Sequence, residues 1–456
     1  MGKDSGTATG GGHVYDSIGI GFGPSNMALA IALEECGRLD NCLFLEASET
    51  FGWHPGMQIR GADIQHNPLR DLVTPRNPAS PYGFLSYLKA HDRLFEYLNL
   101  DAPYPPRSDY AAYIGWVGAQ FADHVRMGTT VQAIRYADGP DGEKLLEVLA
   151  DDGTRHFGRT LNFGTGRSAL IPGQFLTLLG DDVVHLTHYL FAKDRWLKRL
   201  ERPRVAVIGG SQSAAEIVLD LADCADVTSI SRSFGFKHKD LSPFTESIYL
   251  PEFVDYFHAA GVAGQNRMTQ ELWRSNYGAA DPDVVAALNL RLYEQKVTGG
   301  TGLKVLHNRA IDAVTRDAAG GYRLHLTDKY SGMQDVIAVD GVVLATGYRN
   351  FGSAANQEPF HPLLSDIAEF ALFREDGGVE IDRDFRLRTD PAAELPPVFL
   401  NGLCEASHGF GDAGSFSLLS VRSARIAAAM ALHLDHRVRP AEPAMARESR
   451  DRVSLP

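Results

Sequence analysis

Cysteine is scarce in this sequence of 456 residues: there are four, at positions 36, 42, 224 and 404, and none forms a CxxC pair. That pattern excludes a zinc knuckle and a dithiol redox site, and it indicates thiols in a reducing cytoplasm. The histidines at 54, 66, 185, 188, 238 and 408 show no recognisable ligand spacing, so no metal site is predicted. Long apolar runs are also missing, and we expect no transmembrane helix.

Basic residues are outnumbered, with 44 Lys and Arg against 57 Asp and Glu and a net charge of −13. This balance argues against nucleic acid and anionic membranes as partners, although local arginines can still bind an anionic substrate. Residues 1–12 lack the apolar core of a signal peptide, and with residues 437–456 they are predicted to be flexible tails. A chain of this length is expected to form two or three domains.

The segment Asp16–Asn26, D-S-I-G-I-G-F-G-P-S-N, follows a short apolar run and precedes a helix-forming stretch. Strand, glycine-rich turn and helix in this order suit a dinucleotide pyrophosphate, although an ordinary turn is the alternative. Gly19 is expected to allow the tight turn and Gly21 to let the backbone approach the phosphate. A second strand, Cys42–Leu45, ends in a carboxylate that would bind ribose hydroxyls. The predicted site comprises Gly19, Gly21, Gly23, Pro24 (in place of the third glycine), Ser25, Asn26 and Glu46.

A second unit of this kind begins with the strand Arg204–Ile208 in R-V-A-V-I-G-G-S-Q-S. Ser211 stands where the second glycine of the pattern belongs, which makes this turn less typical. The next strand, Val227–Ser231, is followed by Arg232. An arginine there suits a 2′-phosphate and favours NADPH over NADH, with a merely exposed arginine as the alternative. The predicted site comprises Gly209, Gly210, Ser211, Gln212, Ser213 and Arg232.

The order of these elements predicts an α/β fold with two nested Rossmann-like domains. Thr160–Gly166 and Asp340–Tyr348 are apolar strands that end in glycine turns, and we expect both to return to the first domain. The first domain is assigned to residues 13–168 and 335–433. The second is assigned to 200–334, with a small helical substrate region at about 240–300. The long Pro-, Asn- and Arg-rich loop after Glu46 is expected to carry function.

Several motifs are specific in combination: G-F-G-P-S-N, W-H-P-G-M, R-D-L-V-T-P-R-N-P-x-S-P-Y, G-G-S-Q-S-A-A-E, S-P-F-T-E, S-N-Y, L-A-T-G-Y and H-G-F-G-D. With them the chain resembles, over nearly its whole length, the flavin-dependent amine N-monooxygenases, the ornithine and lysine N-hydroxylases of siderophore synthesis. The resemblance implies FAD in the first domain and NADPH in the second. It also implies that NADPH reduces FAD and that O₂ then gives a C4a-hydroperoxyflavin, which hydroxylates a neutral primary amine of an amino acid.

The resemblance also assigns roles to individual residues. Gln65 is implied beside the isoalloxazine ring and NADP⁺, and Asn276 beside the substrate and the nicotinamide ribose; both would be catalytic. Trp53 and His54 are implied to contact the flavin, and Ser417 to close the substrate pocket. The alternative for Gln65 is a loop side chain that caps its own turn, and that for Asn276 is a plain helix-end asparagine. The alternative for Trp53 and His54 is a buried aromatic residue with a turn.

Arg70, Glu246 and the segment His66-Asn67-Pro68, where apolar residues are usual, depart from the family, and one more arginine is a further candidate. Arg70 stands where the ornithine enzymes have a lysine that pairs with the substrate carboxylate, and pairing with neighbouring Asp71 is the alternative. Glu246 replaces the asparagine of P-F-x-N-E and would repel a carboxylate. Arg291, on a helix beyond Asn276, is a candidate for the same substrate pocket, although solvent exposure is the commoner fate of an arginine.

These departures leave the substrate open among an ornithine- or lysine-like amino acid, a different amine such as aspartate, and a diamine. A Baeyer–Villiger or sulfur-oxidising flavin monooxygenase would share both nucleotide folds, but Tyr189 stands where the Baeyer–Villiger motif needs tryptophan. The alternative outside the enzymes is a non-catalytic protein that binds FAD. Family members are often oligomeric, so a homo-oligomer is an expectation, with no interface located in the sequence.

Overall fold

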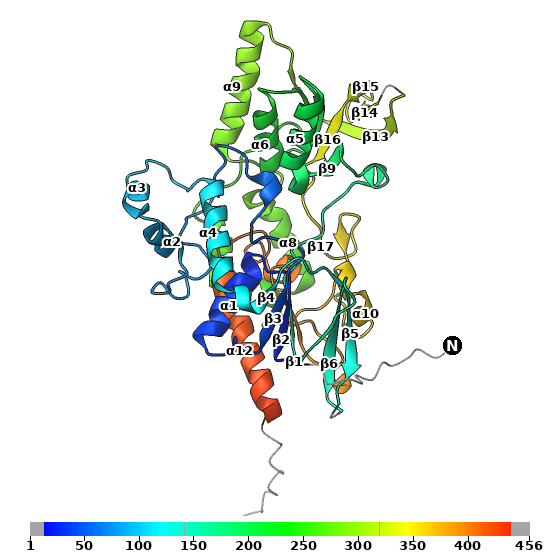
Figure 1. The fold of residues 1–456 in the computed structure, drawn as a ribbon. Coiled ribbons are helices and arrows are strands. Elements are labelled where there is room, and N and C mark those ends of the chain that lie inside the picture. The colour runs from blue at the N-terminus through cyan, green and yellow to red at the C-terminus, as the bar shows by residue number, and fades with distance from the viewer. Residues whose placement is uncertain (1–12, 141, 319, 439–456) are drawn as a thin grey trace, which may run out of the picture.

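The computed structural model describes residues 13–140, 142–318 and 320–438. It contains two five-stranded parallel sheets, each with a glycine-rich turn that leads into a helix, and this confirms the predicted α/β fold (Figure 1). The predicted tails lie outside the described residues, except that 437 and 438 belong to the last helix. Within the part of the chain that the structure describes, none of the helices is both long and apolar enough to cross a membrane.

The first sheet has the strand order β19-β8-β2-β3-β4, and all its pairings are parallel. Its central strand β2 (Ser17–Ile20) is buried along its whole length, as a strand covered on both faces must be. Helix α1 (Pro24–Glu35) follows β2 and packs against the C-terminal helix α12 (Leu419–Val438) (Figure 1). The other strands are β3 Cys42–Leu45, β4 Val125–Arg126, β8 Leu161–Phe163 and β19 Val398–Leu400.

A four-stranded sheet of order β1-β7-β6-β5 and several helices complete the first domain. Helix α4 (Arg107–Gln120) buries positions 110, 113, 114 and 117, the spacing of an amphipathic helix that packs on a core. The strands are β1 Val14–Tyr15, β5 Val131–Asp138, β6 Lys144–Ala150 and β7 Arg155–Gly158. The short elements are α2 Phe84–Ala90, α3 Leu94–Leu98, α10 Ser365–Ala368, α11 Glu405–His408, β17 Asn350–Phe351 and β18 Gln357–Glu358.

The second domain is built on the parallel sheet β12-β11-β10-β16-β9, with an antiparallel sheet of β13, β14 and β15 beside it. The strands of the parallel sheet are β9 Val183–His185, β10 Arg204–Ile208, β11 Asp226–Ile230, β12 Leu303–Leu306 and β16 Gly341–Leu344. The antiparallel strands are β13 Arg309–Arg316, β14 Tyr322–Asp328 and β15 Gln334–Val339. The helices are α5 Tyr189–Arg199, α6 Gln212–Leu221 and α9 Pro282–Thr298.

The expected boundaries of the second domain are wrong at both ends. Strand β16 pairs with β10 on one side and with β9 on the other, so it lies in the second sheet and does not return to the first. Strand β9 belongs to the same sheet although it precedes residue 200. A short apolar strand that is buried on both faces fits either sheet, because its pattern carries no information about its neighbours. The strand expected within Thr160–Gly166 is β8, which does lie beside β2.

The region 240–300 contains the expected helices, but they divide between the domains. The short helices η5 (Thr245–Tyr249), α7 (Pro251–Ala259) and α8 (Gly261–Glu271) form a group, and α7 and α8 lie against α11 of the C-terminal segment. Helix α9 packs instead on α6 of the second domain. The connection between α8 and α9, which carries Asn276, therefore spans the junction of the two domains.

The loop after Glu46 joins the two domains. Met57 and Ile59 come from the first segment of the chain but are buried in the hydrophobic cluster of the second domain. Gly56 lies so close to Thr187 that a Cβ would sit 2.0 Å from the carbonyl oxygen of that residue. The first domain therefore inserts part of its own chain into the second.

Gly19 lies within β2 and not in the turn, which corrects the role expected for it. A Cβ at Gly19 would sit 2.1 Å from Cδ1 of Phe44, whose side chain is 1% exposed. We predict that Gly19→Ala overpacks this core and lowers the free energy of unfolding by about 1–3 kcal/mol. Urea unfolding measures the change, and Gly173→Ala is the control because its Cβ would meet no atom within 4 Å. Equal stability of Gly19→Ala and wild type would contradict the packing described here.

Candidate active site

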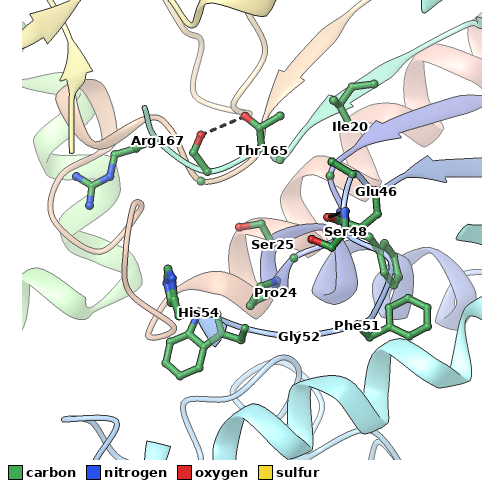
Figure 2. Close-up of a pocket in the computed structure, with 18 of the residues that line it drawn as sticks. Ile20, Pro24, Ser25, Glu46, Ser48, Phe51, Gly52, His54, Thr165 and Arg167 are labelled. Carbon is green, nitrogen blue, oxygen red and sulfur yellow. Dashed lines mark hydrogen bonds between the residues drawn. The ribbon is translucent and has the colours of Figure 1, made fainter. Parts of the chain in front are cut away.

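A cavity of about 540 Å³ opens where the strands of the first sheet end and α1 begins. Figure 2 shows Glu46 and Ser48 at one end, Pro24 and Ser25 in the middle, and His54 near the other. An elongated cavity with a helix N-terminus at its middle suits an extended dinucleotide. Of the residues predicted for FAD, the lining includes Gly21, Gly23, Pro24, Ser25, Glu46, Trp53 and His54.

The middle of the cavity is the turn before α1. Gly21 has φ +78°, and a Cβ there would sit 2.8 Å from the carbonyl oxygen of Gly164, so only glycine fits. Gly23 is the N-cap of α1 and provides no side-chain cap, while Pro24 opens the helix without an N–H group. The next N–H groups of the first turn are therefore free to bind an anion such as a pyrophosphate.

Asn26 is fully buried beneath the turn and does not line the cavity. Its Nδ2 donates to the carbonyl oxygen of Gly21 at 2.7 Å, and its Oδ1 accepts from Nδ2 of Asn401 at 3.1 Å. Arg422 donates to Oδ1 of Asn401 at 2.8 Å and to Oγ of Ser25 at 3.0 Å. The side chain of Asn26 thus fixes the shape of the turn, and Arg422 and Asn401, which sequence reasoning missed, tie it to the C-terminal segment.

Glu46 is oriented by two backbone groups at its end of the cavity. Its Oε2 accepts the N–H of Phe22 at 2.6 Å, and its Oε1 accepts the N–H of Ser48 at 2.9 Å. Each carboxylate oxygen has a further lone pair. Glu46 can therefore accept the ribose hydroxyls that the sequence predicts.

His54 lies near the opposite end, with a left-handed backbone (φ 47°) that is uncommon for a residue other than glycine. His54 is an exposed residue of the cavity lining, so its ring is open to contact from a bound cofactor. Trp53 meets Phe416 edge to face at 5.1 Å between ring centroids. This end of the cavity thus has aromatic side chains on one wall, which suit a flavin ring.

The turn of the second domain accepts serine without strain. Ser211 is the N-cap of α6 with φ −122° and ψ −173°, an extended backbone that any residue adopts. A Cβ on Gly209 would sit 2.4 Å from the carbonyl oxygen of Ala345, so this glycine is required by packing. Arg232 follows β11 with an exposed side chain that pairs with no carboxylate among the described residues. A free guanidinium at this position is what a 2′-phosphate needs.

Gln65 lies outside the cavity lining, at the junction of the domains. Its Nε2 donates to Oε1 of Glu216 on α6 at 3.1 Å, so the alternative in which it caps its own turn is wrong. Glu216 also pairs with Arg107 at 2.9 Å, and the two side chains are 7% and 11% exposed. Sequence reasoning missed both partners. Glu216 stands in a mainly apolar helix, and the sequence could have indicated the pairing from this alone, because a buried carboxylate needs a partner.

Arg70 anchors a polar cluster beside Phe416. Its guanidinium donates to Oγ of Ser417 at 3.2 Å and lies 6.0 Å from the ring centroid of Tyr249. The hydroxyl of Tyr249 donates to Oδ1 of Asn276 at 3.4 Å. Three residues predicted for the substrate, Arg70, Ser417 and Asn276, therefore lie in one cluster.

The negative charge of Glu246 acts on tyrosines that the charge of Arg70 also affects. Burial first, and then the charge of Glu246, raise the pKa of Tyr104 and that of Tyr249, while Arg70 lowers both. Glu246 and Arg70 thus act on the same two tyrosines, neither of which the sequence singled out. A cluster that combines one positive and one negative side chain is suited to a zwitterionic ligand.

Arg291 does not join the cluster, which corrects the sequence prediction. It pairs with Asp223, beyond the end of α6, and its side chain is 43% exposed. The alternative for Arg70 is also wrong, because the buried carboxylate of Asp71 accepts backbone N–H groups instead, including that of Phe84 at 2.7 Å. Helical spacing predicts the face on which Arg291 lies but not what that face packs against.

A second buried network holds the segment that carries Asn276. The next residue, Tyr277, donates its hydroxyl hydrogen to Glu405 at 2.6 Å and accepts from Arg167 at 2.6 Å. Asn350 donates to the same carboxylate at 2.7 Å. Arg167 also lines the cavity, so this network connects the cluster predicted for the substrate to the wall of the predicted FAD site.

His66 stacks on Phe416, with ring centroids 5.3 Å apart and planes 14° apart. Its Nδ1 lies 2.7 Å from the carbonyl oxygen of Ile64, and because a carbonyl only accepts, Nδ1 carries the proton. Its Nε2 is buried with no hydrogen-bond partner among the described residues. Burial, with Arg70 adding to it, lowers the pKa of His66 to about 4. The ring is therefore neutral and aromatic at physiological pH.

Two nested dinucleotide folds, with a cavity at the first glycine-rich turn that suits an extended dinucleotide, define an oxidoreductase of the two-cofactor flavoprotein class. The model of the L-lysine 6-monooxygenase/L-ornithine 5-monooxygenase family matches residues 13–350, and the chain belongs to this family, as the sequence predicted. An L-ornithine N(5)-monooxygenase from Burkholderia cepacia is 38% identical over 410 residues, which are 87% of this chain and 90% of that protein.

Solved structures of relatives share the fold. An ornithine N-hydroxylase from Kutzneria sp. 744, solved with reduced FAD, NADP⁺ and L-ornithine, has a TM-score of 0.83 and 30% identity. An L-lysine 6-monooxygenase from Pseudomonas syringae has a TM-score of 0.80 and 36% identity. Each comparison covers 92% of this chain and 100% of the other.

The lowered pKa of His66 predicts a pH dependence of stability. When the pH falls below about 6.5, the unfolded chain binds a proton at this histidine before the folded protein does, so stability falls until about pH 4. We predict that His66→Phe, which keeps the ring contact, removes about 2 kcal/mol of the stability loss between about pH 7 and pH 5. Urea unfolding at both pH values measures it. The same loss in variant and wild type would show that His66 is not buried in its neutral form.

Proposed function

We propose that this protein uses FAD and NADPH to hydroxylate a primary amine of an amino acid. The observation that carries the proposal is the juxtaposition of two sites at consecutive residues. Phe416 lines the cavity that suits FAD, and Ser417 holds Arg70 in the substrate cluster. The Kutzneria relative, which was solved with both cofactors and L-ornithine, supports this assignment.

The residues described above fit both cofactors. When bound, NADPH supplies the electrons and FAD activates O₂ for transfer of one oxygen atom to the amine. The helix N-terminus of α1 would hold the FAD pyrophosphate, Glu46 the ribose hydroxyls, and Trp53 and His54 the flavin ring. Gly209, Gly210, Ser211, Gln212 and Ser213 would form the NADPH turn, with Arg232 on the 2′-phosphate.

The chain itself orients the amine and excludes water. His66 stacks on Phe416, and Tyr110 meets both rings edge to face, at 5.6 Å and 5.3 Å between centroids. These rings border the cavity through Phe416 and would exclude water from the reacting centre. Asn276, held by Tyr249 and by its neighbour Tyr277, would orient the amine, and Gln65 would orient the two cofactors.

The charges of the cluster favour an amino acid whose side chain ends in an amine. Arg70 would bind the α-carboxylate with its planar fork, and Glu246 would bind the α-ammonium, which leaves a side-chain amine free for oxidation. L-Ornithine and L-lysine have this arrangement. A diamine has no carboxylate for Arg70 to bind, so we favour L-ornithine and L-lysine over a diamine.

Aspartate is a second candidate, since a second cation lies near the cluster. The positive charge of Lys239, like that of Arg70, lowers the pKa of His66, and two cations would suit two carboxylates. Glu246 counts against this candidate because it would repel one of them. The hydroxylated amino acid would serve siderophore or other secondary-metabolite synthesis, as the family resemblance implies.

The experiment that tests the proposal is NADPH oxidation and hydroxylamine formation across L-ornithine, L-lysine, L-aspartate and a diamine. Hydroxylamine from L-ornithine or L-lysine in proportion to NADPH is the expected result. Hydroxylamine from aspartate alone would support the second candidate. NADPH oxidation without any product from these amines would refute the proposed substrates, and FAD binding without NADPH oxidation would favour a non-catalytic flavoprotein.

Arg70→Ala should raise the KM for the amino acid about 30- to 100-fold, because a charge-assisted pair is lost. Flavin reduction by NADPH should persist, since Arg70 does not line the cofactor cavity. Steady-state kinetics and rapid mixing measure the two effects. Arg60→Ala, which removes an exposed arginine from the same loop, is the control. An unchanged KM would rule out Arg70 as the carboxylate ligand.

Arg232→Ala should weaken the use of NADPH about tenfold or more and leave NADH use nearly unchanged, because only NADPH carries the 2′-phosphate. The ratio of kcat/KM for the two cofactors is the measurement. Arg202→Ala is the control, because Arg202 pairs with Asp226 at the other end of the same strands. Equal losses with NADPH and NADH would defeat the assignment of Arg232.

A further inference from the structure

The buried carboxylate of Glu216 is the point at which three segments of the chain meet. Its Oε1 accepts hydrogen bonds from Nε2 of Gln65 at 3.1 Å, Nε2 of Gln212 at 3.0 Å and Nη2 of Arg107 at 2.9 Å. Its Oε2 accepts a fourth from Nη1 of Arg107 at 3.0 Å. With the side chain only 7% exposed, these four donors replace the water that the charge would otherwise bind.

Each donor comes from a segment with a different task. Gln65 ends the loop that reaches the FAD cavity through Trp53 and His54. Gln212 is the first residue of α6, directly after the turn of the second domain. Arg107 is the first residue of α4 in the first domain. Glu216 therefore connects both proposed cofactor sites.

Gln212 extends the connection to the segment after Asn276. Its backbone N–H donates to the carbonyl oxygen of Ala279 at 3.0 Å, and its Oε1 accepts the N–H of Asp281 at 2.7 Å. A shift of Gln212 would therefore move the start of α6 and the chain that follows Asn276 together. The substrate side of the site is thus linked to the same carboxylate.

Arg107 anchors the loop from the other side. Besides its fork on Glu216, it donates to the carbonyl oxygens of Met57 at 3.1 Å and Asp63 at 3.2 Å. Its own backbone N–H donates to the carbonyl oxygen of Ala62 at 2.8 Å. The planar guanidinium serves the loop and the carboxylate at once, which the point charge of a lysine does not do.

We propose that Glu216 is a positioning residue that fixes Gln65 and the NADPH turn relative to each other, so that the two cofactors meet in one reactive arrangement. The inference rests on the proposed function. A glutamine at this position has one acceptor oxygen and a donor NH₂ group that would face the donors of its neighbours. It is close in size to glutamate but does not satisfy four donors.

The test compares Glu216→Gln with Lys193→Met in the purified FAD-bound protein. Lys193 of α5 pairs at 2.7 Å with Asp220 of α6, the helix that also carries Glu216, and the Lys193 side chain is 20% exposed. We expect Glu216→Gln to keep its FAD but to be reduced by NADPH about tenfold more slowly or worse. Lys193→Met should be reduced at the wild-type rate.

The losses of Glu216→Gln and Gln65→Ala should be non-additive in the double variant, because the two residues act as a unit. Hydrogen exchange supplies a readout that is independent of turnover: peptides over 53–65 and the start of α6 should exchange faster in Glu216→Gln and not in Lys193→Met. A fall in stability alone, with wild-type reduction rate and wild-type exchange in these peptides, would overturn the inference.

If Glu216→Gln does not fold, Arg107→Lys takes its place, since it keeps the charge but loses the fork. A slower reduction and faster exchange at the start of α6, which Arg107 reaches only through Glu216, support the inference, and wild-type values for both refute it. If the wild-type protein is not reduced by NADPH at all, the proposed function fails, and the exchange comparison still decides whether Glu216 positions Gln65.

Discussion

The structure depends on the buried contacts that hold the first domain against the second. Two buried contacts fix this relation: the apolar insertion of Met57 and Ile59 into the core of the second domain, and the ion pair between Arg107 and Glu216. A buried ion pair is weak evidence for net stability, since desolvation of two charges offsets much of their attraction. The ion pair contributes geometry instead, because a bidentate contact between two helices permits only a narrow range of domain orientations. The two proposed cofactor turns belong to the two domains that this contact joins, and transfer between two cofactors needs such a fixed geometry.

The C-terminal segment completes the site from the other side. Arg422 supports the first turn through Ser25 and Asn401, and Phe416 lines the cavity, while the adjacent Ser417 binds Arg70. One stretch of chain therefore shapes the cofactor cavity and the substrate cluster together. This arrangement explains why no catalytic triad is needed: the cofactors carry the redox chemistry, and the chain contributes position, charge and exclusion of water.

Local chemistry allowed the sequence to predict both nucleotide folds, the position of Glu46 after its strand, and the grouping of Arg70, Asn276 and Ser417. Glycine turns and strand ends follow short-range rules, and the family motifs supply the long-range grouping. Predictions that required knowledge of packing were wrong or absent. Gly19 makes room for Phe44, Arg291 faces Asp223, and β16 stays in the second sheet. The partnership of Arg107 and Glu216 joins residues 109 positions apart and has no local signature.

The account is tested most directly by the source of the oxygen atom in the product. The FAD-bound protein is mixed with NADPH, L-ornithine or L-lysine, and O₂ labelled with a heavy isotope, and the amine product is analysed by mass spectrometry. We predict a hydroxylamine that carries one labelled oxygen atom on the side-chain nitrogen. Recovery of unmodified amine, with all the label in peroxide or water, would contradict the assignment of this chain as an amine hydroxylase acting on these substrates.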